Sequence, residues 1–240
     1  MSRVTRVATA EGLRPLFAGN SGVPTPVPEP FPSSAPAEGS VWEVEIGFGK
    51  GRYLLRRAAL EPDRRFLGIE IAGEYFRLVA RRVARRRLAN VVLLEGEAQY
   101  LAGSVLPRGF ASVVHVYFPD PWPKLRHHRR RLFAPDSLDL VLGLLAPGGR
   151  LCFATDFLAY GEEVRALLAS HPGAAVSVHE GPWPDGARTN YEAKYLVEGR
   201  SILRLEVALE GAAAPHPEGL LDLLVAPTLR PHPLLPPAPE

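Results

Sequence analysis

Short apolar runs alternate with segments of helical periodicity through most of this chain. Residues 75–88 show the helical pattern, with apolar side chains recurring on one face at Phe76, Val79, Ala80, Val83 and Ala84. Strands are expected over residues 41–46, 66–71, 91–94, 111–118, 151–155, 176–178 and 202–207, and helices over residues 53–60, 75–88, 137–145 and 160–168. Such alternation predicts an α/β protein with a doubly wound, mainly parallel sheet. Ligands of such sheets bind at the carboxyl ends of the strands, so we look for chemistry in the loops that follow them.

The prolines set the expected limits of the folded domain. Of 25 prolines, seven lie in residues 1–40 and eight in residues 211–240. Each proline removes a backbone donor and fixes φ, so the segment 23–36 cannot form a helix or a central strand. We expect a flexible arm over residues 1–40, a folded domain over 41–210 and a proline-rich tail over 211–240. An arm that becomes ordered on a partner is the alternative for either end.

Composition excludes several classes of protein. The net charge of +2 over 240 residues fits neither a histone-like polycation nor an acidic tail protein. There is no run of 18 apolar residues and no apolar secretion segment after the first residues, so a cytoplasmic protein without a membrane span is expected. The single cysteine, Cys152, excludes an internal disulfide framework and a multi-cysteine zinc site. We interpret it as a buried apolar residue of the fifth strand.

The loop after the first strand is rich in glycine and reads Glu45-Ile-Gly-Phe-Gly-Lys-Gly51. The dinucleotide fingerprint G-x-G-x-x-G fails here, because Arg52 and Leu54 stand where its third glycine would fall. The pattern E-x-G-x-G-x-G, with Gly47, Gly49 and Gly51, instead resembles the first motif of class I S-adenosylmethionine (SAM)-dependent methyltransferases. A glycine-rich turn without a ligand is the alternative.

Acidic residues follow the next two strands. Glu70 ends the second strand, 19 residues after Gly51, where a carboxylate can accept hydrogen bonds from both ribose hydroxyls of a nucleoside ligand. Glu97 follows the third strand and could reach the adenine side of the same ligand. The spacing of Glu70 supports a ligand site more strongly than Glu97 does.

The loop after the fourth strand reads Phe-Pro-Asp-Pro-Trp-Pro-Lys over residues 118–124. Three alternating prolines stiffen it and should push each preceding residue, Asp120 included, to an extended conformation. The basic run that follows over residues 126–131 predicts a polyanionic substrate. Its two histidines lack neighbouring acids or cysteines, so no metal site is expected. A second run of arginines over 77–87 is interpreted as a solvated helix face, and the alternative is that it extends the surface that contacts the substrate.

Taken together, these motifs resemble those of the bacterial tRNA (guanine-N7-)-methyltransferases, from about residue 41 to residue 207. The family's F-P-D-P-W-P-K appears at 118–124, its T-D-x-x-x-Y at 155–160 and its T-x-[FY]-E at 189–192. Its R-H-x-K-R-R corresponds to R-H-H-R-R-R at 126–131, where arginine replaces the lysine. The resemblance implies a Rossmann-like class I methyltransferase fold with seven strands, the last antiparallel. It also implies transfer of a methyl group from SAM to N7 of guanine 46 in the tRNA variable loop.

The resemblance implies a role for each matching residue. SAM would be held by Glu45, Gly47, Gly49, Gly51, Glu70, Glu97 and Asp120. The guanine would be held by Lys124, Asp156, Thr189, Asn190, Tyr191 and Glu192. tRNA phosphates would be contacted by Arg126, His127, His128, Arg129, Arg130 and Arg131. The family usually has aspartate at the position of Glu97, which makes this the weakest implied contact. The oligomeric state, monomer or homodimer, is left open.

Guanine N7 has a lone pair and no proton, so it can attack the methyl group without a general base. Catalysis should therefore come from in-line alignment and from a carboxylate near the developing positive charge, for which Asp120 is the candidate. Asp156 and Glu192 would accept hydrogen bonds from the N1–H and N2–H groups of guanine. A methyltransferase acting on another RNA or on a small molecule, and a non-catalytic RNA-binding module, are the competing hypotheses.

Overall fold

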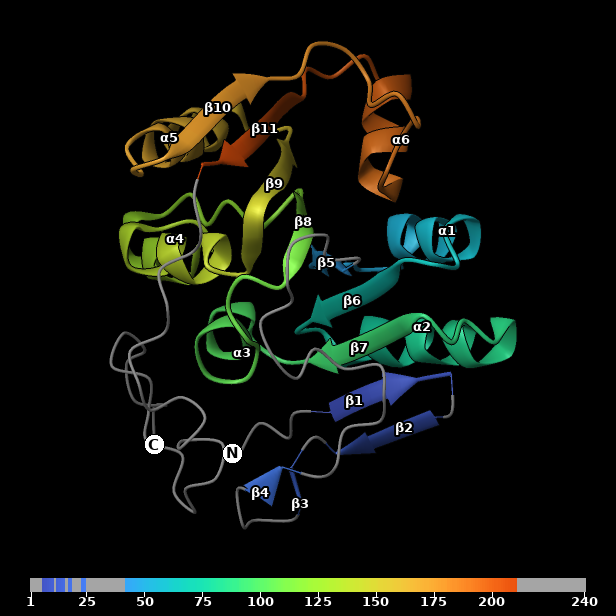
Figure 1. The fold of residues 1–240 in the computed structure, drawn as a ribbon. Coiled ribbons are helices and arrows are strands. Elements are labelled where there is room, and N and C mark those ends of the chain that lie inside the picture. Colours follow the sequence, from blue (N-terminus) through green and yellow to red (C-terminus); the bar gives the residue numbers. More distant parts are fainter. Residues whose placement is uncertain (1–5, 11, 16, 19–22, 25–41, 211–240) are drawn as a thin grey trace.

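The computed structural model describes residues 6–10, 12–15, 17–18, 23–24 and 42–210. A nine-stranded sheet runs through its centre in the order β10-β11-β9-β8-β5-β6-β7-β1-β2 (Figure 1). Its strands are β1 (Arg6–Thr9), β2 (Gly12–Pro15), β5 (Trp42–Ile46), β6 (Arg65–Glu70), β7 (Val91–Glu95), β8 (Ala111–Tyr117), β9 (Leu145–Thr155), β10 (Ala174–Val178) and β11 (Leu203–Leu209). A separate pair is formed by β3 (Phe17–Ala18) and β4 (Val23–Pro24).

The seven expected strands occupy consecutive positions in this sheet. Strands β5 to β9 pair in parallel, and β11 runs antiparallel to both of its neighbours, which confirms the predicted class I methyltransferase fold. The hairpin β1–β2 adds two strands beside β7 and comes from the segment expected to be a flexible arm. Residues 25–41 and 211–240, most of the proline-rich arm and tail, lie outside the described residues, and the domain limits stay predictions.

Helices cover both faces of the sheet (Figure 1). On one face lie α1 (Arg52–Leu60) and α2 (Gly73–Arg86), and on the other α3 (Ala98–Ser104), α4 (Pro135–Leu142) and α5 (Leu158–Ala169). The shorter elements η1 (Leu125–Arg130, a 3₁₀ helix) and α6 (Asn190–Val197) complete the chain. The sequence did not predict α3, η1 or α6. None of the described helices is long and apolar enough to span a membrane.

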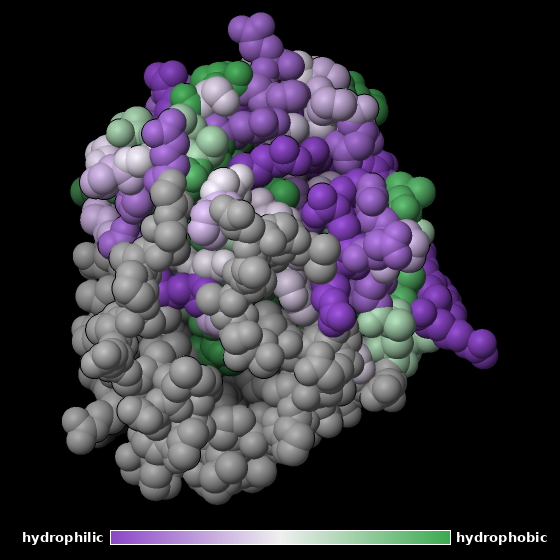
Figure 2. Space-filling view, in the orientation of Figure 1, coloured by the Kyte–Doolittle hydropathy of each residue, from purple (hydrophilic) through white to green (hydrophobic). Residues whose placement is uncertain are grey.

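The core is built from the predicted apolar runs. One cluster packs α1 and α2 on the sheet through Phe66, Phe76 and Leu93, while α3, α4 and α5 pack on the opposite face. Cys152 is buried, as expected, and Trp183 is buried as well. The arginines of α2 are exposed at positions 77, 81 and 85, and Figure 2 shows hydrophilic side chains gathered where the end of α2 projects at the right of the view.

The strand order reverses between β5 and β8. Ile46 is in register with both Ile69 of β6 and Val116 of β8, and Tyr117 is in register with Ala154 of β9. This register brings the ends of β5, β6, β8 and β9 to one edge of the sheet. The loops predicted to carry chemistry therefore meet at the switch point, where doubly wound sheets bind their ligands.

Candidate active site

The glycine loop turns sharply between β5 and α1. Gly47, Gly49 and Gly51 have positive φ values of 77°, 50° and 69°, which residues with a Cβ atom rarely adopt. A Cβ added at Gly47 or Gly49 would meet nothing within 4 Å, so these residues leave open space on the outer side of the loop. A Cβ at Gly51 would lie 2.9 Å from Val79 of α2. Two of the glycines thus keep space for a ligand, whereas the third allows α1 and α2 to pack closely.

Glu45 and Glu70 hold the two sides of this loop. Glu45 accepts a hydrogen bond of 3.0 Å from the Leu54 amide, and Glu70 accepts bonds of 2.8 Å and 2.9 Å from the amides of Gly49 and Ala72. Burial raises the pKa of Glu45 to about 8, and the nearby charge of Glu70 adds to this, although the Leu54 amide opposes it. Both carboxylates therefore lie at the switch point, as predicted. Glu97 is half-buried where α3 begins, directly after β7.

The loop over residues 118–124 differs from expectation in its backbone. Phe118 and Trp122, each followed by proline, have φ values of 52° and 38°, so the extended conformation predicted for them is wrong. Two contacts hold Phe118 in place. Its amide donates a hydrogen bond of 2.7 Å to the Ala154 carbonyl, and its ring packs edge-on against the ring of Tyr195 in α6. Asp120 is exposed between these two strained residues. The loop is thus rigid, with its carboxylate free to meet a ligand.

The basic run forms η1 and is not uniform. Arg126 and Arg130 are exposed, and His127 and His128 are half-buried. The guanidinium of Arg130 lies 5.1 Å from the centre of the Trp122 ring, which connects the run to the proline loop. No group of residues that could hold a metal ion is present in the part of the chain that the structure describes.

Arg131, the last residue of the run, is only 6% exposed. It donates to the Pro121 carbonyl at 2.8 Å and pairs with Glu163 of α5. The guanidinium of Arg131, for which a phosphate contact was predicted, is thus held by contacts inside the protein.

The segment 189–192 begins α6. Thr189 caps the helix by accepting a hydrogen bond of 2.9 Å from the Glu192 amide, while Asn190 and Tyr191 are exposed. Glu192, expected to bind guanine, is fully buried and pairs with Arg204 of β11 at 2.8 Å. Its other oxygen accepts a bond of 2.7 Å from the Arg188 amide. Glu192 is therefore held inside the protein by an ion pair, and its contact with guanine stays a prediction.

The remaining residues predicted to hold guanine lie around this segment. Asp156 is half-buried after β9 and faces Arg200 at 3.6 Å, and Lys124 is exposed at the start of η1. Tyr191 is 58% exposed and packs against Phe118 with ring centres 6.3 Å apart. The ends of β8 and β9 and the start of α6 therefore form one connected surface.

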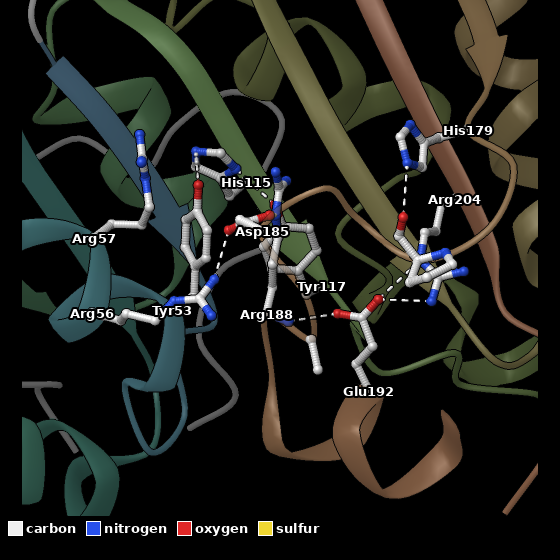
Figure 3. Close-up of polar contacts among 12 residues, drawn as sticks. Tyr53, Arg56, Arg57, His115, Tyr117, His179, Asp185, Arg188, Glu192 and Arg204 are labelled. Carbon is white, nitrogen blue, oxygen red and sulfur yellow. Dashed lines mark hydrogen bonds and ion pairs between the residues drawn. The ribbon is translucent and has the colours of Figure 1, made fainter. Parts of the chain in front are cut away.

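A buried polar network that the sequence did not predict lies beneath this surface (Figure 3). Arg188 donates to the Tyr117 hydroxyl at 2.6 Å, and its guanidinium lies 4.1 Å from the centre of the Trp183 ring. The Tyr117 hydroxyl is 2.8 Å from Nδ1 of His115, whose Nε2 lies 3.2 Å from the Tyr53 hydroxyl. The residues that precede the proline loop and the 189–192 segment are thereby fixed to each other.

The charges of this network are matched. Arg188 also pairs with Asp185 at 2.9 Å, and Asp185 pairs with Arg56 of α1 at 2.6 Å (Figure 3). Burial lowers the pKa of His115, although the hydrogen bond with Glu43 and the charge of Glu43 act against this. Glu43 has a pKa of about 2, because the hydrogen bond with His115 and the charge of Arg57 outweigh the effect of burial. Only the fold reveals this network, since its members are scattered from residue 43 to residue 188.

The strand order, glycine loop and carboxylates together define a class I SAM-dependent methyltransferase. A family model described as "Putative methyltransferase" matches residues 40–205, and the chain belongs to this family. Proteins named "tRNA (guanine-N(7)-)-methyltransferase" are similar to it. The protein of Nitrosococcus oceani is 37% identical over 159 residues, covering 66% of this chain and 67% of that protein. The protein of Leifsonia xyli is 37% identical over 167 residues, covering 68% of this chain and 74% of that protein.

Solved structures share the fold. The 16S rRNA methyltransferase KamB matches with a TM-score of 0.57 and 13% identity, covering 86% of this chain and 100% of that one. A 16S rRNA (adenine(1408)-N(1))-methyltransferase from Catenulisporales acidiphilia matches with a TM-score of 0.52 and 18% identity, covering 87% and 98%. At these identities the likeness concerns the fold alone.

Proposed function

We propose that this protein is a tRNA (guanine-N7)-methyltransferase that transfers a methyl group from SAM to N7 of guanine 46 in the variable loop. One observation carries the proposal. The rigid loop over residues 118–124 and the basic helix η1 follow β8, directly across the switch point from the glycine loop. A cofactor loop, an exposed carboxylate and a cationic surface for a polyanion thus share one edge of the sheet. The names of the similar proteins support the same reaction.

The residues present fit SAM. A ligand can occupy the open space over Gly47 and Gly49, and Glu70 lies beside it to accept the ribose hydroxyls. Glu45, Gly51, Glu97 and Asp120 complete the proposed cofactor site. When bound there, SAM supplies an electrophilic methyl group on a sulfonium.

The chain then has to orient the base and stabilise charge. The N7 lone pair of guanine would take the methyl group as the bond between this group and the sulfonium sulfur breaks, and the cofactor would leave as a neutral thioether. No residue has to remove a proton, and the positive charge would pass to the purine ring. We assign Asp120 to the stabilisation of this charge, and Asp156 to the acceptance of N–H groups on the opposite edge of guanine. Lys124, Thr189, Asn190 and Tyr191 line the base site. Arg126, His127, His128, Arg129 and Arg130 bind phosphates.

The test is methylation of unmodified tRNA with tritiated SAM, followed by mapping of the labelled base. Label at N7 of guanine 46 supports the proposal. Label on another base or RNA indicates a different methyltransferase, and absence of transfer indicates an RNA-binding module.

Asp120→Asn tests the catalytic assignment. It should lower kcat by about 100-fold, because the exposed side chain keeps its shape but loses its charge. Asp63→Asn, an exposed carboxylate in the turn before β6, is the matched control. A wild-type kcat for Asp120→Asn would refute the role of Asp120.

A further inference from the structure

Arg131 differs from the other arginines of the basic run whose side chains are described. Its side chain is 7% exposed, and its Nε donates to the Pro121 carbonyl at 2.8 Å. The guanidinium lies 4.7 Å from the centre of the Tyr160 ring and pairs with Glu163, both on α5. The backbone carbonyl of Arg131 accepts a bond of 3.0 Å from the buried Gln99 of α3. Arg131 is thus fixed from two helices while it binds the proline loop.

The proline loop needs such a fixed partner. Left-handed conformations at Phe118 and Trp122 cost about 1–3 kcal/mol each, and persist only where the surroundings impose them. Upstream of Asp120, the Phe118 amide is held by the Ala154 carbonyl at 2.7 Å. Downstream, the Pro121 carbonyl is held by Arg131 at 2.8 Å, in a charge-assisted hydrogen bond. Asp120 is therefore held between two anchors, and Arg131 is the downstream one.

The partners of Arg131 also belong to the element that follows Asp156. Tyr160 and Glu163 lie in the first half of α5, which starts two residues after Asp156. The Arg131 guanidinium thus connects the loop that carries Asp120, after β8, to helix α5, which follows Asp156 at the end of β9.

We propose that Arg131 is a positioning residue, which fixes the loop that carries Asp120 relative to the base site and does not bind phosphate. The catalytic part of this proposal rests on the proposed function. Arg131→Gln should lower kcat at saturating tRNA and SAM by about 10- to 100-fold, since displacement of a catalytic group by about 1 Å can have such an effect. The salt dependence of tRNA binding should stay that of the wild type.

Two control variants separate positioning from phosphate binding. Arg126→Gln removes an exposed arginine of the same basic run and should reduce the slope of log K against log salt by about one. Arg165→Gln removes an arginine of α5 whose ion partner is Glu162, and should behave as the wild type. A reduced salt slope for Arg131→Gln, or an unchanged kcat, would overturn the proposal.

Tryptophan fluorescence tests the loop without any activity. Trp42 and Trp183 are 7% and 2% exposed, whereas Trp122 is half-buried in the loop, so acrylamide quenching reports mainly on Trp122. Arg131→Gln should increase quenching and Arg126→Gln should not; equal quenching in both would refute the anchoring of the loop. If Arg131→Gln does not fold, Glu163→Gln should shift quenching in the same direction, because Glu163 is 57% exposed and its loss only weakens the hold on Arg131. A wild-type protein that fails to methylate tRNA would refute the proposed function, while the quenching result would still test the anchor.

Discussion

At the scale of single residues, Glu43 and Glu45 show how neighbours decide charge. They lie two positions apart on the same face of β5, and both are buried. Glu43 faces His115 and two arginines, and its pKa falls to about 2, whereas burial beside Glu70 raises that of Glu45 to about 8. At neutral pH the first is therefore ionised and the second protonated. The sequence motif shows both acids but not this difference.

The pKa of Glu45 predicts a loss of stability as the pH rises. Its ordinary value is 4.5, so between pH 4.5 and pH 8 the folded protein retains a proton that the unfolded chain releases. The free energy of unfolding of the ligand-free protein should fall over this range, by at most about 1.4 kcal/mol per pH unit. Glu45→Gln, which mimics the protonated form, should remove this decline in urea titrations. The control Glu74→Gln, at an exposed position of α2, should keep it. The same decline in Glu45→Gln would contradict the prediction.

The pair of Glu192 and Arg204 predicts a large effect on stability. The two residues are 0% and 4% exposed, so removal of one charge leaves the other buried without a partner. Glu192→Gln should lower the free energy of unfolding by about 3–5 kcal/mol. The double variant Glu192→Leu/Arg204→Met should recover most of this loss, as measured by urea unfolding. If Glu192→Gln keeps wild-type stability, the ion pair does not contribute the stability that we assign to it.

At the scale of elements, the sequence predicts the helices and strands that bury a regular apolar face. In β7, residues 91–94 form a continuous apolar run, and α2 buries Phe76, Val79 and Val83 at helical spacing. In contrast, α6 buries only Glu192 and exposes Tyr191 and Val197, so no apolar stripe marks it. Its start could have been found from the Thr189-x-x-Glu192 spacing, which is typical of a helix N-terminus. The backbone before the prolines was predicted wrongly, since tertiary contacts at Phe118 override the local preference.

Packing of the glycine loop against α2 predicts unequal effects of two similar substitutions. Gly47→Ala and Gly51→Ala both place a side chain at positive φ, but only the second brings its Cβ to 2.9 Å from Val79. Gly51→Ala should lower the thermal midpoint more than Gly47→Ala does. The free energy of unfolding of the Gly51→Ala variant should be the lower of the two by about 1–3 kcal/mol. Gly47→Ala should instead weaken SAM binding, because its methyl group enters the open space above the loop. Equal thermal midpoints for the two variants would contradict this division of roles.

At the scale of the whole molecule, strand order brings the predicted site together. Glu45 and Glu70 lie at the ends of β5 and β6, and Asp120 and Asp156 follow β8 and β9. The reversal of strand order beside β5 places these strand ends at one edge. A pattern of alternating elements is sufficient to predict that arrangement. It cannot predict the contact of Arg188 with Trp183 and Tyr117, since residues remote in sequence meet only once the sheet has formed. Nor does it show the hairpin at the far edge, whose strands are four residues each.

That hairpin predicts a role for the N-terminal segment in stability. In β1, Val7 and Ala8 are each 1% exposed and pair with Leu94 and Leu93 of β7, and Arg6 pairs with Glu95 at 3.3 Å. Deletion of residues 1–16 should lower the free energy of unfolding by at least about 2 kcal/mol, because the Val7 site is lost and an apolar strand edge is exposed. Urea unfolding measures the loss, and light scattering should show association through the free edge of β7. Val7→Ala keeps the hairpin and should have a smaller effect without association. A deletion variant that is monomeric and as stable as the wild type would mean that the sheet does not depend on its two outer strands.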